Sequence, residues 1–85
     1  MKTVEIYTTP SCPYCVAAKR LLAKKGVSFT EIDVSRDAAA RMTMTQRAGG
    51  RRTVPQIFIG GQHVGGSDEL HDLEDRRKLD PMLAD

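Results

Sequence analysis

Residues 3–34, TVEIYTTPSCPYCVAAKRLLAKKGVSFTEIDV, carry the pattern of a strand, a helix and a second strand. Residues 3–8 and 28–34 alternate between apolar and polar types and are rich in β-formers, which predicts two strands. Between them, apolar residues recur at helical spacing from Tyr14 to Lys25, and Gly26 ends that helix. A strand, helix and strand in this order predict two parallel strands joined by a right-handed crossover.

The rest of the chain predicts a second helix, a hairpin and a third helix. Gly60-Gly61 is a two-residue turn signal between two short apolar segments. A last helical turn is expected at Asp80-Pro81. The predicted ranges are 37–48 for a helix, 53–59 for a strand that Pro55 interrupts, 62–66 for its partner strand and 67–75 for a helix. The order β-α-β-α-β-β-α predicts an α/β fold with a four-stranded mixed sheet flanked by helices.

Composition limits the class of protein. A chain of 85 residues with 40% hydrophobic and 28% charged residues predicts one globular domain over residues 1–85. A net charge of +2 and four aromatic residues do not predict nucleic-acid binding. Apolar runs fall far short of the roughly 18–20 residues of a membrane span, and the first ten residues lack the apolar stretch of a secretory signal. We therefore expect a cytoplasmic monomer.

Cys12 and Cys15 are the only cysteines, and they lie where the first helix is predicted to begin. A zinc site needs about four ligands, and the eight-residue spacing of His63 and His71 fits no usual pattern. A helix N-terminus favours thiolate, and the first thiol of such a pair can have a pKa between about 3.5 and 7.5. We expect Cys12 to be the exposed nucleophile and Cys15 the buried resolving thiol. His63 and His71 are expected to be surface or boundary residues.

Three motifs together resemble those of a dithiol glutaredoxin of the short bacterial type. They are CPYC at 12–15, TVPQIFI at 53–59 and GGSDEL at 65–70, and the resemblance extends from Val4 to Leu83. It implies a thioredoxin fold and a glutathione-dependent thiol–disulfide oxidoreductase. Glutathione would be the co-substrate, with no metal and no tightly bound cofactor. Partners would be disulfide-containing or glutathionylated proteins, of which ribonucleotide reductase is one candidate.

The same resemblance implies a glutathione site next to Cys12. In the family the proline at the position of Pro55 is cis, which leaves the backbone of Val54 free to pair with the cysteinyl backbone of glutathione. The first turn of the third helix would hold the γ-glutamyl carboxylate, and Asp68 its ammonium group. The implied glutathione-binding residues are Tyr14, Thr53, Val54, Pro55, Gly66, Ser67 and Asp68.

One position departs from the family pattern. Many glutaredoxins carry a lysine three residues before the first cysteine, where it pairs with the glycine carboxylate of glutathione, and this chain has Thr9 there. Several other residues are candidates for that contact. They are Thr9 itself, Gln46, Arg47, Arg51 and Arg52.

Two other functions are considered. Redoxins reduced by thioredoxin reductase share the cysteine motif, but they usually have an SGFRP-like segment and lack the acidic SDEL stretch that this chain has. Glutaredoxins that carry a [2Fe–2S] cluster between two subunits typically have CGFS, or a small residue at the position of Pro13. The proline therefore favours the oxidoreductase.

Overall fold

The computed structural model describes all residues from Met1 to Asp85. Eight elements follow one another in the predicted order, and the expected last helical turn forms a short helix of its own. They are β1 (Val4–Thr8), α1 (Pro13–Lys24), β2 (Thr30–Asp33), α2 (Ala38–Arg47), β3 (Gln56–Ile59), β4 (Gln62–Gly65), α3 (Ser67–Asp75) and α4 (Leu79–Leu83).

The four strands form one mixed sheet, as the sequence predicts, and their order in space is β2-β1-β3-β4. β1 and β2 are parallel, and α1 crosses between them. β3 is antiparallel to β1, with Ile6 opposite Ile57, and β4 returns antiparallel to β3. Gly60 and Gly61 both have positive φ, at 58° and 81°, which is the backbone of a type I′ hairpin turn.

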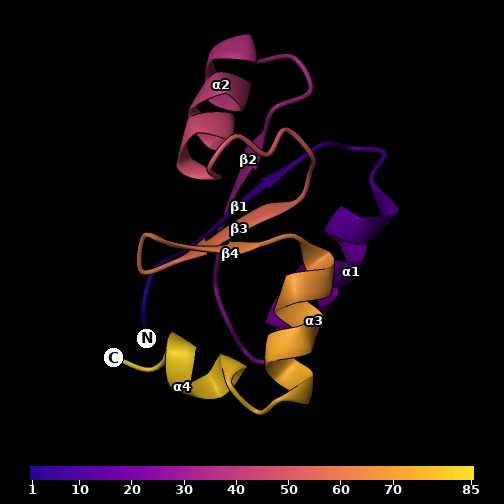
Figure 1. The fold of residues 1–85 in the computed structure, drawn as a ribbon. Helices are drawn as coiled ribbons and strands as arrows, with labels where there is room; N and C mark the ends of the chain where they lie inside the picture. Colours follow the sequence, from indigo (N-terminus) through magenta and orange to yellow (C-terminus); the bar gives the residue numbers. More distant parts are fainter.

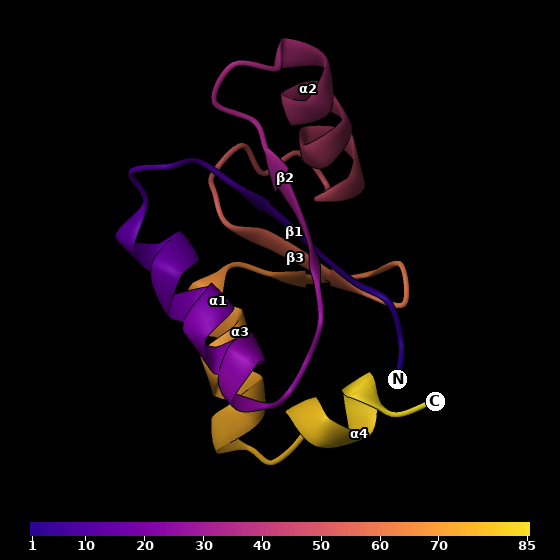
Figure 2. The same ribbon diagram turned by 180° about the vertical axis from the view of Figure 1, so that it is seen from behind.

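Alternating side chains of the sheet make two separate hydrophobic clusters. Ile6 and Ile57 belong to the larger cluster, which α1, α3 and α4 cover. Tyr7 and Phe58, one position further along each strand, belong to a smaller cluster with Met44 of α2. Successive side chains of a strand point to opposite faces, so the sheet is buried on both sides. Figures 1 and 2 show α2 on one face of the sheet and α1 and α3 together on the other.

Two details differ from the sequence prediction. The third strand begins at Gln56, not Thr53, so residues 53–55 form a loop that leads into it. Proline has no N–H for the sheet ladder, which explains why pairing begins after Pro55. In α1 the buried side chains include Cys15, Ala18 and Leu22, whereas Val16, one of the apolar residues of the predicted helix, is 40% exposed.

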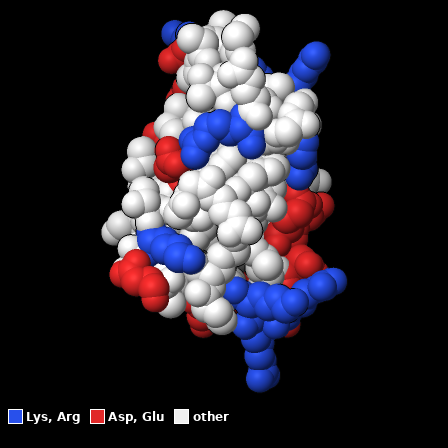
Figure 3. Space-filling model, turned by 60° about the vertical axis from the view of Figure 1, so that its left-hand side comes forward, with Lys and Arg blue, Asp and Glu red and all other residues white.

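The chain ends lie close together, away from the start of α1 (Figure 2). The Lys2 amide donates a hydrogen bond to the Leu83 carbonyl over 2.9 Å, which ties α4 to the N-terminal segment. On the face drawn in Figure 3, basic and acidic side chains lie beside one another at several places, and basic groups gather at its lower end. None of the helices has the length and apolar character that crossing a membrane requires.

Candidate active site

Cys12 is the N-cap of α1, and its sulfur takes part in the cap. The backbone N–H of Cys15 donates a hydrogen bond to the Cys12 sulfur over 3.1 Å. Pro13 occupies the first position of the helix, where an N–H would have no partner inside the helix. The sulfur of Cys12 therefore lies at the helix end where N–H groups are free and a negative charge is favoured.

Cys15 differs from Cys12 in its surroundings. Cys15 is 1% exposed, whereas Cys12 is partly exposed. Burial, reinforced by the hydrogen bond with Cys12, raises the pKa of Cys15 from 9.0 to about 12, although a backbone hydrogen bond from Thr9 acts in the opposite direction. At neutral pH Cys15 is thus a protonated thiol, and the predicted difference in exposure between the two cysteines is confirmed.

The loop at residues 53–55 lies against the cysteine pair. The peptide bond between Val54 and Pro55 is cis, as in the family that the sequence resembles. The Cys12 thiol points to the Val54 carbonyl oxygen, with 3.8 Å between sulfur and oxygen. Cys12 and Val54 are 42 residues apart in sequence, so only the tertiary fold brings the CPYC and TVP motifs together.

A pocket of about 250 Å³ opens beside this contact. All seven residues predicted as glutathione contacts line it. Its walls come from the first turn of α1, the loop before β3 and the first turn of α3. The lining residues are Tyr14, Arg51, Thr53, Val54, Pro55, Gly66, Ser67, Asp68 and Glu69. Three distant segments thus meet at one hollow next to the Cys12 sulfur.

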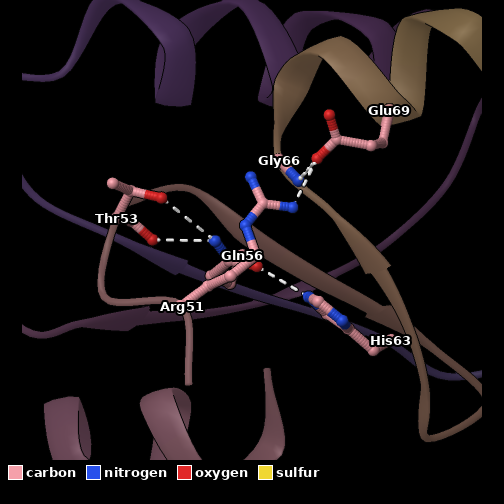
Figure 4. Close-up of polar contacts among 6 residues, drawn as sticks. All are labelled: Arg51, Thr53, Gln56, His63, Gly66 and Glu69. Carbon is pink, nitrogen blue, oxygen red and sulfur yellow. Dashed lines mark hydrogen bonds and ion pairs between the residues drawn. The ribbon is translucent and has the colours of Figure 1, made fainter. Parts of the chain in front are cut away.

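Arg51 and Glu69 join two walls of the pocket. The Arg51 guanidinium donates to the Glu69 carboxylate over 2.7 Å, and the same carboxylate oxygen accepts the Gly66 N–H over 2.7 Å (Figure 4). These two donors hold the pKa of Glu69 below its usual value, the backbone N–H contributing most. A Cβ on Gly65 would lie 2.5 Å from that oxygen, so the turn into α3 needs glycine there.

Comparison with known proteins identifies the family. The Glutaredoxin family model matches residues 4–64, well over half of the chain. This protein belongs to the glutaredoxin family. Glutaredoxin 3 of Escherichia coli is 55% identical over 83 residues, which is 98% of this chain and 99% of that protein.

Solved glutaredoxins have the same fold. The solution structure from Brucella melitensis is 57% identical with a TM-score of 0.86, covering 98% of this chain and 89% of that one. The buckwheat glutaredoxin–glutathione complex is 32% identical with a TM-score of 0.87, covering 96% of this chain and 76% of that one. The predicted family and thioredoxin fold are therefore confirmed.

A chain of hydrogen bonds supports the pocket loop of this glutaredoxin from behind. Gln56, which is fully buried, donates from its side-chain amide to the Thr53 carbonyl over 3.0 Å. Its amide oxygen lies 2.7 Å from His63 Nε2, which must carry the proton because an amide oxygen can only accept (Figure 4). His63 is thus a boundary residue, as predicted, but it acts on the loop through Gln56.

The glutaredoxin places its candidate contacts for the glycine carboxylate in different surroundings. Arg47 does not line the pocket. Its guanidinium binds both carboxylate oxygens of Glu5, donates to the Tyr7 hydroxyl, and lies 4.0 Å from the centre of the Phe58 ring. The pocket lining also excludes Thr9, Gln46 and Arg52, whereas it includes Arg51.

The sequence prediction omitted one polar residue of the pocket, Glu69. The sequence feature that could have identified Glu69 is the spacing of a capping box, in which a glutamate lies three positions after the N-cap residue, here Gly66. Gly66, not Ser67, is the N-cap of α3, so Ser67 is its first helical residue.

Proposed function

We propose that this glutaredoxin reduces protein disulfides and glutathionylated mixed disulfides, with glutathione as its co-substrate. One observation carries the proposal. The seven residues that the sequence assigns to a glutathione site line a single pocket, and the Cys12 sulfur lies against the Val54 carbonyl that borders it. The buckwheat glutaredoxin of the same fold was solved as a complex with glutathione, which supports the same ligand here.

The pocket offers a distinct partner for each part of the tripeptide. We propose that the Val54 backbone pairs with the cysteinyl residue, as a neighbouring strand would. The first turn of α3 has free N–H groups for the γ-glutamyl carboxylate, and the exposed Asp68 carboxylate suits its ammonium group. This arrangement would hold the glutathione sulfur next to Cys12.

Arg51 is our proposed contact for the glycine carboxylate in place of the family lysine. It is the one arginine that lines the pocket, and its side chain is 46% exposed. Glu69 holds its guanidinium in the free protein, so a ligand carboxylate would compete with Glu69 or share the cation. Arg47 does not suit this contact, because its guanidinium already binds Glu5 and Tyr7 and packs on the Phe58 ring.

The reaction follows from the different surroundings of the two thiols. The Cys12 thiolate attacks the glutathione sulfur of a mixed disulfide, and the target thiolate leaves and takes up a proton. A second glutathione thiolate then attacks the glutathione sulfur bound to Cys12, which releases glutathione disulfide and restores the Cys12 thiolate. With a protein disulfide, the Cys12 thiolate attacks one of the two sulfurs, and the other sulfur leaves as a thiolate. Cys15 then loses its proton and attacks the Cys12 sulfur, which releases the second target thiolate. Two glutathiones reduce the resulting Cys12–Cys15 disulfide and leave as glutathione disulfide.

Serine substitutions test these roles. Cys12→Ser should abolish turnover of a glutathionylated peptide, whereas Cys15→Ser should retain much of it and lose reduction of protein disulfides. An active Cys12→Ser protein with an inactive Cys15→Ser protein would overturn the assignment.

A second pair of variants tests Arg51. Arg51→Gln should raise the KM for glutathione about three- to tenfold, as expected for a lost charged contact near the surface. Arg20→Gln, which removes an exposed arginine of α1, is the matched control and should leave the KM unchanged. Equal KM values for both variants would remove Arg51 from the site.

The other two functions have direct tests. Reduction supported by NADPH and thioredoxin reductase without glutathione would favour the redoxin. A visible absorbance band after anaerobic purification would favour a [2Fe–2S] carrier. The cytoplasmic setting, the monomeric state and the protein targets stay predictions.

A further inference from the structure

The Ser67 side chain lies at the pocket with a histidine behind it. His71, one helical turn further along α3, places Nδ1 at 2.8 Å from the Ser67 carbonyl oxygen and 3.2 Å from the Ser67 hydroxyl oxygen. Ser67 is 6% exposed and lines the pocket. The sequence alone gives His71 no role in the reaction.

The two distances determine which group donates. A carbonyl oxygen can only accept a hydrogen bond, so at 2.8 Å the Nδ1 atom of His71 must carry the proton. An Nδ1–H group cannot accept the hydroxyl proton of Ser67. The Ser67 oxygen is therefore the acceptor in the longer, 3.2 Å contact, and the Ser67 proton has no partner within the protein.

The free hydroxyl proton lies among other free donors. The first N–H groups of a helix have no acceptor inside the helix, and of those near Ser67 only the Gly66 N–H is occupied, by Glu69. Asp68 adds a negative charge at the same end of the pocket. Donors next to a carboxylate suit a group that carries both charges, such as the α-amino acid end of a ligand, better than a simple anion.

We propose that His71 is a positioning residue: by donating from Nδ1 it turns the Ser67 hydroxyl toward the α-carboxylate of the γ-glutamyl residue at the start of α3. The inference rests on the proposed function, because it needs glutathione as the ligand. It adds a side-chain contact to the backbone contacts of the helix start, and it gives His71 a role without contact to the ligand.

A double-mutant cycle tests the proposal. Ser67→Ala should raise the KM for glutathione about fivefold, and His71→Phe about threefold, with kcat unchanged, since a hydrogen bond to a charged group is lost or weakened. The double variant should be no worse than Ser67→Ala, because both act on one hydroxyl. His71→Gln, which keeps an N–H donor, should restore most of the affinity. Effects that multiply in the double variant would overturn the proposal.

A ligand variant separates this proposal from the proposed function. In 4-aminobutanoyl-cysteinylglycine the α-carboxylate is missing, so wild type and Ser67→Ala should have the same KM for it. A wild-type protein without glutathione-dependent activity would instead contradict the proposed function. If the penalty of Ser67→Ala persists with the analogue, the hydroxyl does not bind that carboxylate.

A spectroscopic readout requires no activity. The 15N spectrum of the His71 ring, recorded at pH 8, should show the Nδ1–H tautomer. If His71→Phe does not fold, the KM of Ser67→Ala and the tautomer of His71 still test the proposal. An Nε2–H tautomer would contradict it, because Nδ1 would then be free to accept a hydrogen bond from the Ser67 hydroxyl.

Discussion

The backbone N–H of Cys15 donates a hydrogen bond to the sulfur of Cys12 over 3.1 Å. Cys15 thus stabilises the sulfur of Cys12, while the sulfur of Cys15 is itself buried. The Cys15 side chain is 1% exposed, and burial raises its pKa to about 12. The two thiols therefore differ in reactivity because α1 begins between them.

Cys15 should resist alkylation when it is the only cysteine. In Cys12→Ser protein we expect iodoacetamide to modify Cys15 at pH 8 about a hundredfold more slowly than in the same protein unfolded in urea, because the reactive thiolate is scarce and the sulfur is buried. Mass spectrometry of timed samples gives both rates. Equal rates in folded and unfolded protein would show that burial does not protect Cys15.

Arg47 should stabilise the fold and leave glutathione binding unaffected. Arg47→Met should lower the free energy of unfolding by about 1–2 kcal/mol, since it removes a bidentate ion pair with Glu5 and the contact with the Phe58 ring. Urea unfolding measures the loss, and Arg20→Met serves as the exposed control. A raised KM for glutathione in Arg47→Met at unchanged stability would return Arg47 to the binding site.

Glu69 should make stability depend on pH in the acid range. The Gly66 N–H and Arg51 lower the pKa of Glu69 below its ordinary 4.5, so its folded value lies below its unfolded value. Its contribution is then fully present above about pH 4.5 and is lost as the pH falls through the folded value.

Urea unfolding of Glu69→Gln checks that pH window. Glutamine keeps an acceptor for the Gly66 N–H but loses the ion pair, which is nearly half exposed, so wild type should exceed the variant by about 0.5 kcal/mol at pH 7. The difference should shrink as the pH falls below about 4.5. Asp75→Asn, an exposed change on the same helix, should show no such trend. A difference that grows on acidification would contradict the assignment.

Two glycines with similar backbones allow a matched test of the pocket. Gly65 and Gly50 have φ values of 121° and 100°, so alanine is strained at either, by about 1–3 kcal/mol. A Cβ at Gly50 meets nothing within 4 Å, whereas at Gly65 it meets Glu69 at 2.5 Å and Arg51 at 3.1 Å.

Gly65→Ala should therefore be the more damaging change. We expect it to lower the unfolding free energy about 1 kcal/mol more than Gly50→Ala, because it displaces the carboxylate that caps α3. It should also raise the KM for glutathione, which Gly50→Ala should not. Equal stability and equal KM for the two variants would mean that Glu69 moves aside freely.

Which side chains of a helix are buried depended on contacts that the periodicity of the sequence does not describe. Met42 and Met44 both belong to α2, yet Met44 is fully buried and Met42 is 64% exposed. Val16 has an apolar side chain but faces solvent, because Cys15, Ala18 and Leu22 occupy the face of α1 that meets the sheet. Local spacing gives the period of a helix, and packing decides which face is covered.

By itself, the sequence determined the order of elements and the cysteine motif at a helix start, because periodicity and capping are local. Its resemblance to the glutaredoxins implied the seven glutathione contacts that line the pocket. Only the tertiary structure decided which arginine lies at the pocket and holds Glu69, and how His63 reaches Thr53 through Gln56. Those relations depend on the distance and direction between side chains of segments that packing brings together.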